Sequence, residues 1–144
     1  MNTATSVAER AAPRGTADVA NIFSTEELNI LHRLAHTLYT QGLYDDSTRY
    51  FWFLSLHAPT DKRYLKGLGA SQFMAKRFGE AVITYSYLAA FAPQDPEVHC
   101  MCGHSLLMQG DLADARKCLE LAAALPGKSP FTERANALLE LMPK

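Results

Sequence analysis

The sequence predicts an all-α fold in which pairs of helices stack into a superhelix, because several kinds of residue recur every 34 positions. Small residues stand at Ala35, Gly69 and Gly103. The same spacing separates two further series, Ser47, Ala81 and Ala115, and Phe51, Tyr85 and Leu119. A proline follows each of the first two units, at Pro59 and Pro93.

A period of 34 residues with these features is the helix–turn–helix pattern of tetratricopeptide repeats. We therefore expect three helix pairs, at about 28–61, 62–95 and 96–127, and a capping helix at about 129–142. Stacked pairs of this kind bury a shared seam and curve, so that the first helix of each pair lines a concave wall. We assign these elements to one domain, 22–144, preceded by a flexible segment, 1–21.

The first pair has clear boundaries. Ser24 followed by Glu27 is a capping-box sequence, which predicts a helix from Thr25 to about Thr40. Gly42 permits a sharp turn. The second helix, 45–57, should end before Pro59, because a residue that precedes proline disfavours the helical region.

The later elements follow the same signals. Helices at 61–75 and 79–91 flank a turn at Lys76 and Arg77, and Pro93 ends the pair. Asp95 before Pro96 is typical of a helix start, so the third pair should run from there to 109 and, after a turn at Gly110, from 112 to 125. A last helix is expected at 129–141.

Composition limits the possible partners. The chain has 144 residues, of which 48% are hydrophobic and 20% are charged, which suffices for a folded core. A net charge of −1 with scattered lysines and arginines argues against nucleic acid as a partner. The sequence contains no run of 18 apolar residues, so we expect no membrane insertion. Three cysteines without an apolar leader favour a reducing compartment, so we expect a cytoplasmic protein.

The periodic residues divide into a seam and a wall. We assign packing roles to the small residues and to Leu34, Leu68, Ala81, Ala115, Phe51 and Tyr85. The stripe facing the concavity then contains Asn29, His32, His36 and Tyr39, then Arg63, Lys66, Ala70 and Phe73, then Glu97, Cys100, His104 and Leu107. A solvated face would carry mostly Glu, Lys and Gln, so this mixed aromatic and apolar stripe indicates an apolar peptide as ligand.

The candidate peptide-binding residues are the members of this stripe other than Asn29 and Glu97, joined by the nearby Tyr44. They are His32, His36, Tyr39, Tyr44, Arg63, Lys66, Ala70, Phe73, Cys100, His104 and Leu107. The alternative for Tyr44 and Phe73 is that they complete the core. Recognition of an acidic C-terminus is disfavoured, because that requires Lys or Arg together with Asn on the wall, where the chain has His32, His36 and Ala70.

The sequence holds no convincing catalytic or metal site. In the segment 99–104, His99 and Cys102 share one side of a helix while Cys100 and His104 share another, so they cannot surround one ion. No nucleophile with its base and no carboxylate pair can be assigned to one cleft. We therefore expect no metal, no cofactor and no enzymatic activity.

An aromatic run, 50–54, is apolar around the whole helix, although the seam requires only Phe51 and Leu54. Such a helix should be covered on both sides. Two explanations remain open for Trp52 and Phe53: the N-terminal segment packs over them, or they form a homodimer interface.

Several segments go beyond the generic repeat. They are GLYDD at 42–46, RYLKGLGA at 63–70, AVITYSYLA at 81–89, Pro93, and GDLADA at 110–115. With these, residues 24–125 resemble the class II chaperones of bacterial type III secretion, which hold hydrophobic translocator proteins before export.

The resemblance implies a three-repeat protein of the bacterial cytoplasm whose groove binds an extended N-terminal translocator segment, with prolines and a leucine in pockets. The aromatic wall of the family falls here on His32, His36, Tyr39 and Tyr44. Two histidines replace aromatic residues, which suggests pH-sensitive binding. The resemblance also implies a homodimer through the N-terminal region and first repeat. The main alternative is a general tetratricopeptide scaffold for another complex.

Overall fold

The computed structural model describes residues 22–144, and within this range the chain forms seven helices and no strands. The helices are α2 (Thr25–Thr40), α3 (Tyr44–His57), α4 (Lys62–Met74), α5 (Phe78–Ala89), α6 (Pro96–Met108), α7 (Leu112–Ala124) and α8 (Pro130–Leu141). Each predicted helix is present, and its ends lie within two residues of the prediction. The flexible segment predicted at 1–21 lies outside the described residues.

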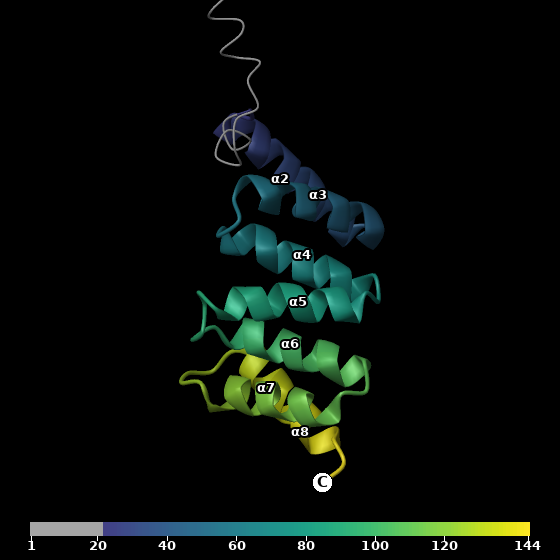
Figure 1. Ribbon diagram of the computed structural model, residues 1–144, viewed down its shortest axis with the longest axis vertical. Helices are drawn as coiled ribbons and strands as arrows, with labels where there is room; N and C mark the ends of the chain where they lie inside the picture. Colours follow the sequence, from purple (N-terminus) through teal and green to yellow (C-terminus); the bar gives the residue numbers. More distant parts are fainter. Residues whose placement is uncertain (1–21) are drawn as a thin grey trace, which may run out of the picture.

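The helices stack in chain order along the long axis of the molecule, with α8 at the end farthest from α2 (Figure 1). Each helix packs against the next, and α8 contacts both α7 and α6. The predicted all-α tetratricopeptide architecture with a final capping helix is therefore confirmed. Within residues 22–144, no helix has the length and hydropathy that a membrane span requires.

The helix starts use the predicted side chains. Ser24 accepts a hydrogen bond from the backbone N–H of Glu27 at 3.2 Å, and Glu27 accepts one from the backbone N–H of Ser24 at 2.7 Å. This reciprocal pair is the predicted capping box. Asp95 likewise accepts from the N–H of Glu97 at 3.0 Å, with Pro96 as the first helical residue.

The recurring small residues allow paired helices to approach closely. A Cβ atom added to Gly69 would lie 2.7 Å from the ring of Tyr85, and one added to Gly103 would lie 2.7 Å from Leu119. Ala35, in the first pair, is fully buried. The predicted packing role of these three residues is confirmed, because any larger side chain would force the helices apart.

The seam assignment is wrong for one residue. Leu68 and Phe51 are buried as expected, but Leu34 is 39% exposed. Leu68 stands 34 residues after Leu34 and is covered by the helix pair that precedes it. No described helix precedes α2, so Leu34 stays on the surface.

Buried hydroxyl groups join the first two pairs. Ser47 donates to the carbonyl oxygen of Ala35 at 3.0 Å, and its oxygen lies 2.8 Å from that of Ser71. Both serines are fully buried. The contacts link α2, α3 and α4 at one point and satisfy groups that would otherwise be costly to bury.

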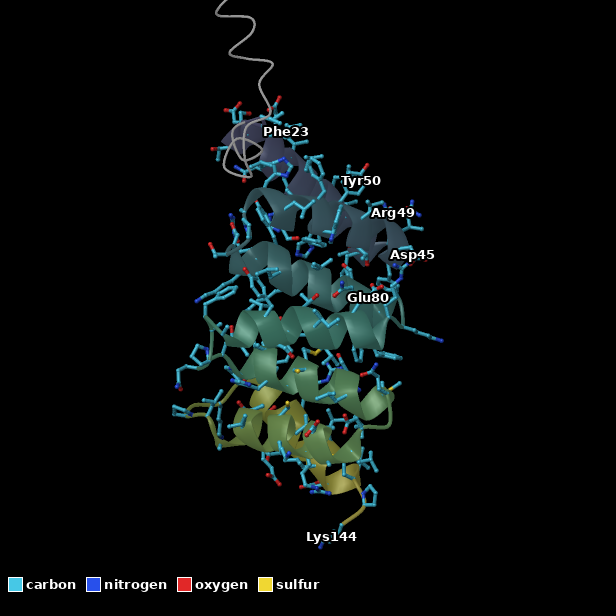
Figure 2. The ribbon with its side chains drawn as sticks, in the orientation of Figure 1. Phe23, Asp45, Arg49, Tyr50, Glu80 and Lys144 are labelled. Atoms are coloured by element: carbon cyan, nitrogen blue, oxygen red, sulfur yellow. The ribbon has the colours of Figure 1, made fainter. Side chains whose placement is uncertain are left out.

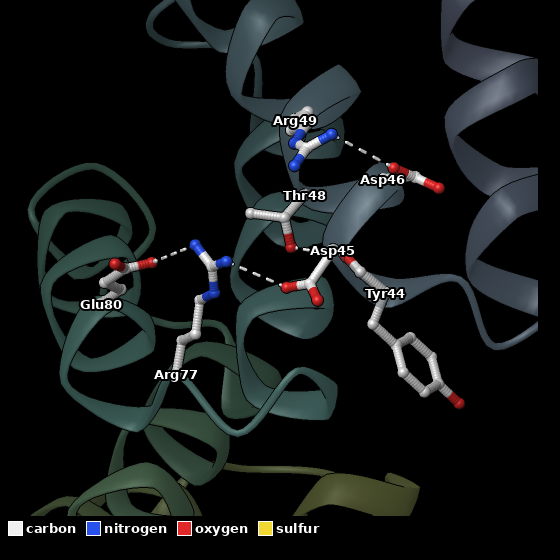
Figure 3. Close-up of polar contacts among 7 residues, drawn as sticks. All are labelled: Tyr44, Asp45, Asp46, Thr48, Arg49, Arg77 and Glu80. Atoms are coloured by element: carbon white, nitrogen blue, oxygen red, sulfur yellow. Dashed lines mark hydrogen bonds and ion pairs between the residues drawn. The ribbon is translucent and has the colours of Figure 1, made fainter.

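An exposed ion pair joins α3 to the start of α5. The guanidinium group of Arg77 lies 3.0 Å from Asp45 and 3.8 Å from Glu80 (Figure 3). Asp45 and Glu80 lie at the same side of the stack, and Tyr50 lies further along α3 (Figure 2). Exposed ion pairs stabilise little, so the seam supplies most of the cohesion.

The turn inside each pair uses a backbone conformation that favours glycine. The φ angles are 79° at Gly42, 62° at Lys76 and 84° at Gly110, and these positions are also 34 residues apart. An L side chain in this left-handed region costs about 1–2 kcal/mol. The second turn therefore carries backbone strain that the other two avoid.

We predict that Lys76→Gly raises the free energy of unfolding by about 0.5–1 kcal/mol, the relief of strain less the added flexibility of the unfolded chain. The reciprocal Gly110→Lys should lower it by about 1–2 kcal/mol, since space is open around Gly110 and only the backbone is affected. Urea unfolding followed by circular dichroism measures both. Changes of the same sign would contradict this account of the turns.

Candidate functional site: a groove on the concave wall

A groove of about 330 Å³ opens on the wall formed by the first helix of each pair. Its lining comes from α2, α4 and α6, with one residue of α3 at the floor. The lining residues are His32, His36, Tyr39, Phe51, Arg63, Lys66, Gly67, Ala70 and Glu97. Six of the predicted binding residues thus line one groove: His32, His36, Tyr39, Arg63, Lys66 and Ala70.

The floor of the groove depends on Gly67 and Phe51. A Cβ atom on Gly67 would collide with the ring of Phe51. Without that atom, Phe51 of α3 reaches between α2 and α4 into the groove. Phe51 therefore both packs in the seam and lines the groove, whereas the sequence indicated only packing.

One wall of the groove is made of rings. The His32 ring lies 5.8 Å from Phe51 and 5.2 Å from Tyr64, both edge to face. Tyr39 and Tyr44 meet at 5.4 Å in the same geometry. Tyr44 points away from its neighbour Asp45 and from Arg77, the residue with which Asp45 forms an ion pair (Figure 3). These contacts hold the rings in place before any ligand binds.

Burial controls the protonation of this wall. Burial first, and then the nearby charge of Arg63, lower the pKa of His32 from its ordinary value. Burial, with a smaller contribution from Tyr44, raises the pKa of Tyr39. Both side chains are therefore neutral at neutral pH, which suits an apolar ligand.

Charged groups stand at the edge of the groove and are paired. The Lys66 amine lies 2.6 Å from Asp95 and 2.9 Å from Glu97. Burial alone would lower the pKa of Lys66, but its hydrogen bonds to Asp95 and Glu97 outweigh that effect and raise it. Arg63 is bound to Asp61 at 2.9 Å. Lys66 thereby joins α4 to the start of α6, whereas the Arg63 pair lies within the first turn of α4.

A second cluster, formed by Phe73, His104 and Arg134, lies on α4, α6 and α8. The ring of His104 lies 4.7 Å from Phe73, and its Nδ1 accepts a hydrogen bond from Arg134 at 2.8 Å. Burial, and then the charge of Arg134, lower the pKa of His104 to about 4. Phe73 also packs on Phe78 at 5.3 Å and against the central core, so it contributes to both the core and this cluster.

The third repeat departs from the prediction. Cys100 is fully buried among residues of α6, α7 and α8, so its assignment to the ligand-binding surface is wrong. Leu107 packs partly against the same cluster. The cause is α8, which contacts α6 more extensively than α4 does and covers the stripe that is open on α2 and α4.

Arg134 was missed by the sequence analysis. The 34-residue pattern ends before α8, and that helix was expected only to cap the stack. Because α8 lies against α6, its Arg134 reaches the concave side. No periodic signal could have placed this residue there.

The outer face carries a separate apolar surface. A hollow of about 740 Å³ includes Trp52 and Phe53 of α3 and Ile83 and Tyr87 of α5. Trp52 is 54% exposed and Ile83 is 71% exposed. Phe53 is partly covered, since Phe23 packs on it at 5.5 Å. Phe23 belongs to the folded domain, and the segment 1–21 lies outside the described residues, so both explanations for the aromatic run stay predictions.

The residues of the segment 99–104 do not converge. His99 binds the carbonyl oxygen of Pro93 at 2.7 Å, while Cys100 lies in the core. Across residues 22–144, no three His, Cys, Asp or Glu side chains are placed to hold a metal ion.

The stacked pairs and their open groove define a tetratricopeptide-repeat protein, and the family model described as tetratricopeptide repeat matches residues 64–95. The chain is 31% identical over 130 residues to low calcium response locus protein H of Yersinia pseudotuberculosis, covering 88% of this chain and 77% of that protein.

Two solved chaperones are similar throughout. The structure of the Yersinia enterocolitica type III secretion chaperone SycD in complex with a peptide of the translocator YopD has a TM-score of 0.75 and 30% identity, covering 82% of this chain and 93% of that chain. The structure of PcrH of Pseudomonas aeruginosa in complex with the chaperone-binding region of PopD has a TM-score of 0.77 and 30% identity. The match covers 83% of this chain and 93% of that chain. The chain belongs to this family of type III secretion chaperones.

We predict that acid destabilises the fold through His104. Its pKa of about 4 lies below the ordinary 6.5, so the unfolded chain binds this proton more tightly than the folded chain. The stability that neutral His104 contributes is complete above pH 6.5 and is lost as the pH falls from there toward 4.

Thermal unfolding of wild type and His104→Gln from pH 7.5 to 4 measures this contribution. The variant should show the flatter pH dependence, and Arg134→Gln should show an intermediate one, because burial still acts on His104 there. Equal slopes in wild type and His104→Gln would contradict the assignment.

Proposed function

We propose that this protein is a chaperone that binds an extended segment of a type III secretion translocator in its concave groove and keeps that translocator soluble until export. The observation that supports this most directly is the open groove with one wall of rings, in a chain whose relatives SycD and PcrH bind translocator segments. The proposed peptide-binding residues are His32, His36, Tyr39, Tyr44, Arg63, Lys66, Ala70, Phe73, His104 and Leu107.

The groove suits an unfolded ligand. An extended peptide can place apolar side chains between the rings while its backbone remains accessible to polar groups at the edge. Ordering the segment costs about 2–5 kcal/mol, which leaves moderate affinity and permits release at the secretion machinery. The wall itself is packed in advance, so little further ordering of the chaperone is needed.

The two histidines distinguish this groove. His32 and His36 lie 6.1 Å apart on successive turns of α2, at positions where the resemblance described above implies aromatic residues. Imidazole rings are flat like aromatic rings and also carry hydrogen-bonding nitrogens. The pockets should therefore accept a client side chain with a polar edge beside its apolar part. Modulation of binding by pH remains a prediction.

With this function we propose that the protein acts in the bacterial cytoplasm, where translocators are synthesised. A general scaffold joining two folded proteins is the alternative. Co-expression separates the two: a translocator that aggregates alone should become soluble and co-purify with this chain.

We predict that Tyr39→Ala weakens binding of a peptide spanning the chaperone-binding region of PopD by about tenfold, because it removes a ring from the groove wall. The free energy of unfolding should fall by only about 1 kcal/mol, the value of its contact with Tyr44. Fluorescence anisotropy of the labelled peptide and urea unfolding measure the two effects.

Tyr87→Ala is the matched control, since Tyr87 is an exposed tyrosine of the outer face. It should leave peptide affinity unchanged. Equal loss of affinity in both variants would argue against the groove as the client site.

We further propose that Trp52 contributes to a homodimer interface on the outer face. Its exposed ring lies with Ile83 and Tyr87 along an apolar hollow, and such surfaces commonly mark contacts between proteins. A dimer is also known for SycD. Phe53 would support this surface from beneath, through its contact with Phe23.

Trp52→Ser is expected to raise the dimer dissociation constant by about tenfold or more, because buried tryptophans dominate many interfaces. Sedimentation equilibrium measures the constant. Leu121→Ser, which changes an equally exposed apolar residue on α7, should have no effect. A dimer unaffected by Trp52→Ser would place the interface elsewhere.

A further inference from the structure

Arg134 occupies an unusual position for a charged residue of a capping helix. It projects from α8 toward α6 and α4, where one guanidinium nitrogen donates to His104 Nδ1 at 2.8 Å. Its guanidinium carbon lies 6.0 Å from the centre of the Phe73 ring. The side chain is half-buried and held by these two contacts, so its remaining N–H groups have a defined direction.

The charge of Arg134 is not compensated by a carboxylate in the described part of the chain. Arg49, Arg63 and Arg77 each form an ion pair with an aspartate, whereas no ion pair within residues 22–144 involves Arg134. Its one partner, His104, is neutral at neutral pH and accepts a single hydrogen bond. The cluster therefore carries a full positive charge with unused donors.

This charge acts on the groove. Its field reaches Tyr39 on α2. The charge of Arg134 lowers the pKa of Tyr39, although burial has the larger effect and raises it. The cations that line the groove, Lys66 and Arg63, are bound to carboxylates and offer less to a ligand. Of Arg63, Lys66 and Arg134, only Arg134 forms no ion pair with a described carboxylate and keeps donors for an incoming group.

A guanidinium group with parallel N–H donors matches a carboxylate in bidentate geometry. Phosphate would fit the same donors, but the chain has a net charge of −1 and no basic cluster to attract polyanions. A client segment seated on the aromatic wall would bring its own side chains past Phe73 and Arg134. An Asp or Glu at that point would both pair the charge and lie beside an apolar surface.

We propose that Arg134 determines client specificity by binding a side-chain carboxylate of the translocator segment beside Phe73 and His104, where that segment continues beyond the groove. The proposal rests on the proposed chaperone function and adds a requirement to it: an acidic residue at a fixed position relative to the apolar anchors. His104 and Phe73 act as positioning residues that orient the guanidinium group.

The test uses the PopD peptide in two scans, in which each position is replaced in turn by Glu or by Gln. Glu and Gln have nearly the same shape, so the ratio of their affinities reports charge recognition. Wild type should prefer Glu by about tenfold at one or two adjacent positions, and the preference should fall as salt is raised. Arg134→Gln should lose the preference, and Arg134→Lys should keep part of it because the charge remains but the fork is lost.

Lys117→Gln is the matched control, because it removes the same charge from an exposed site on α7 and should keep the full Glu preference. Equal affinities for Glu and Gln at every position in wild type, or a preference that survives in Arg134→Gln, would overturn the proposal while leaving the chaperone function intact. If neither the unsubstituted PopD peptide nor any variant binds wild type, the proposed function fails, and this proposal with it.

A second measurement does not depend on the folding of Arg134→Gln. In nitrogen-15 labelled wild type, the Nε–H resonance of Arg134, assigned by its absence in Arg134→Lys, should shift on binding the preferred Glu peptide. The matching Gln peptide, at equal saturation, should leave that resonance nearly unchanged. Identical shifts with both peptides would also overturn the proposal.

Discussion

The close approach of paired helices at a small residue is the constraint on which the rest of this structure depends. The ring of Tyr85 lies against Gly69, and Leu119 lies against Gly103, with no room for a Cβ atom in either place. Because each pair is closed in the same way, one pair can stack on the next along the molecule. The first helices are thereby brought onto one side, and that side becomes the wall of a groove.

The groove inherits its asymmetry from the two ends of the stack. At the α2 end, His32 and Tyr39 line the groove, because no described helix other than α4 packs beside α2 on the concave side. At the other end, α8 leans over α6 and covers Cys100, while it brings Arg134 to the surface. A regular array of repeats would present similar chemistry along its length. Here one end is lined by rings, and the capping helix adds the positive charge of Arg134 at the other end.

The two faces separate two tasks. The concave side holds rings that are fixed by contacts such as those of His32 with Phe51 and Tyr64, so a flexible client meets a rigid surface. The outer side exposes Trp52 and Ile83, which belong to the second helices and do not touch the groove. A second copy bound there would leave the client site open. This division follows from the fold, since first and second helices always face opposite sides.

Local features were determined by the sequence alone. Residues near one another in the chain determine the caps at Ser24 and Asp95, the turn at Gly42, and the crossings at Gly69 and Gly103. The repeat spacing predicted that His32, His36, Lys66 and Ala70 lie on one wall, and they line the same groove. Tertiary structure decided which surfaces remained open. Leu34 is exposed because no described helix precedes α2, and Cys100 is buried because α8 covers it. Arg134 reaches His104 and Phe73 because of how that same helix packs. Periodicity specifies the direction of a side chain on its own helix, whereas its exposure depends on the neighbours that the assembled chain places beside it.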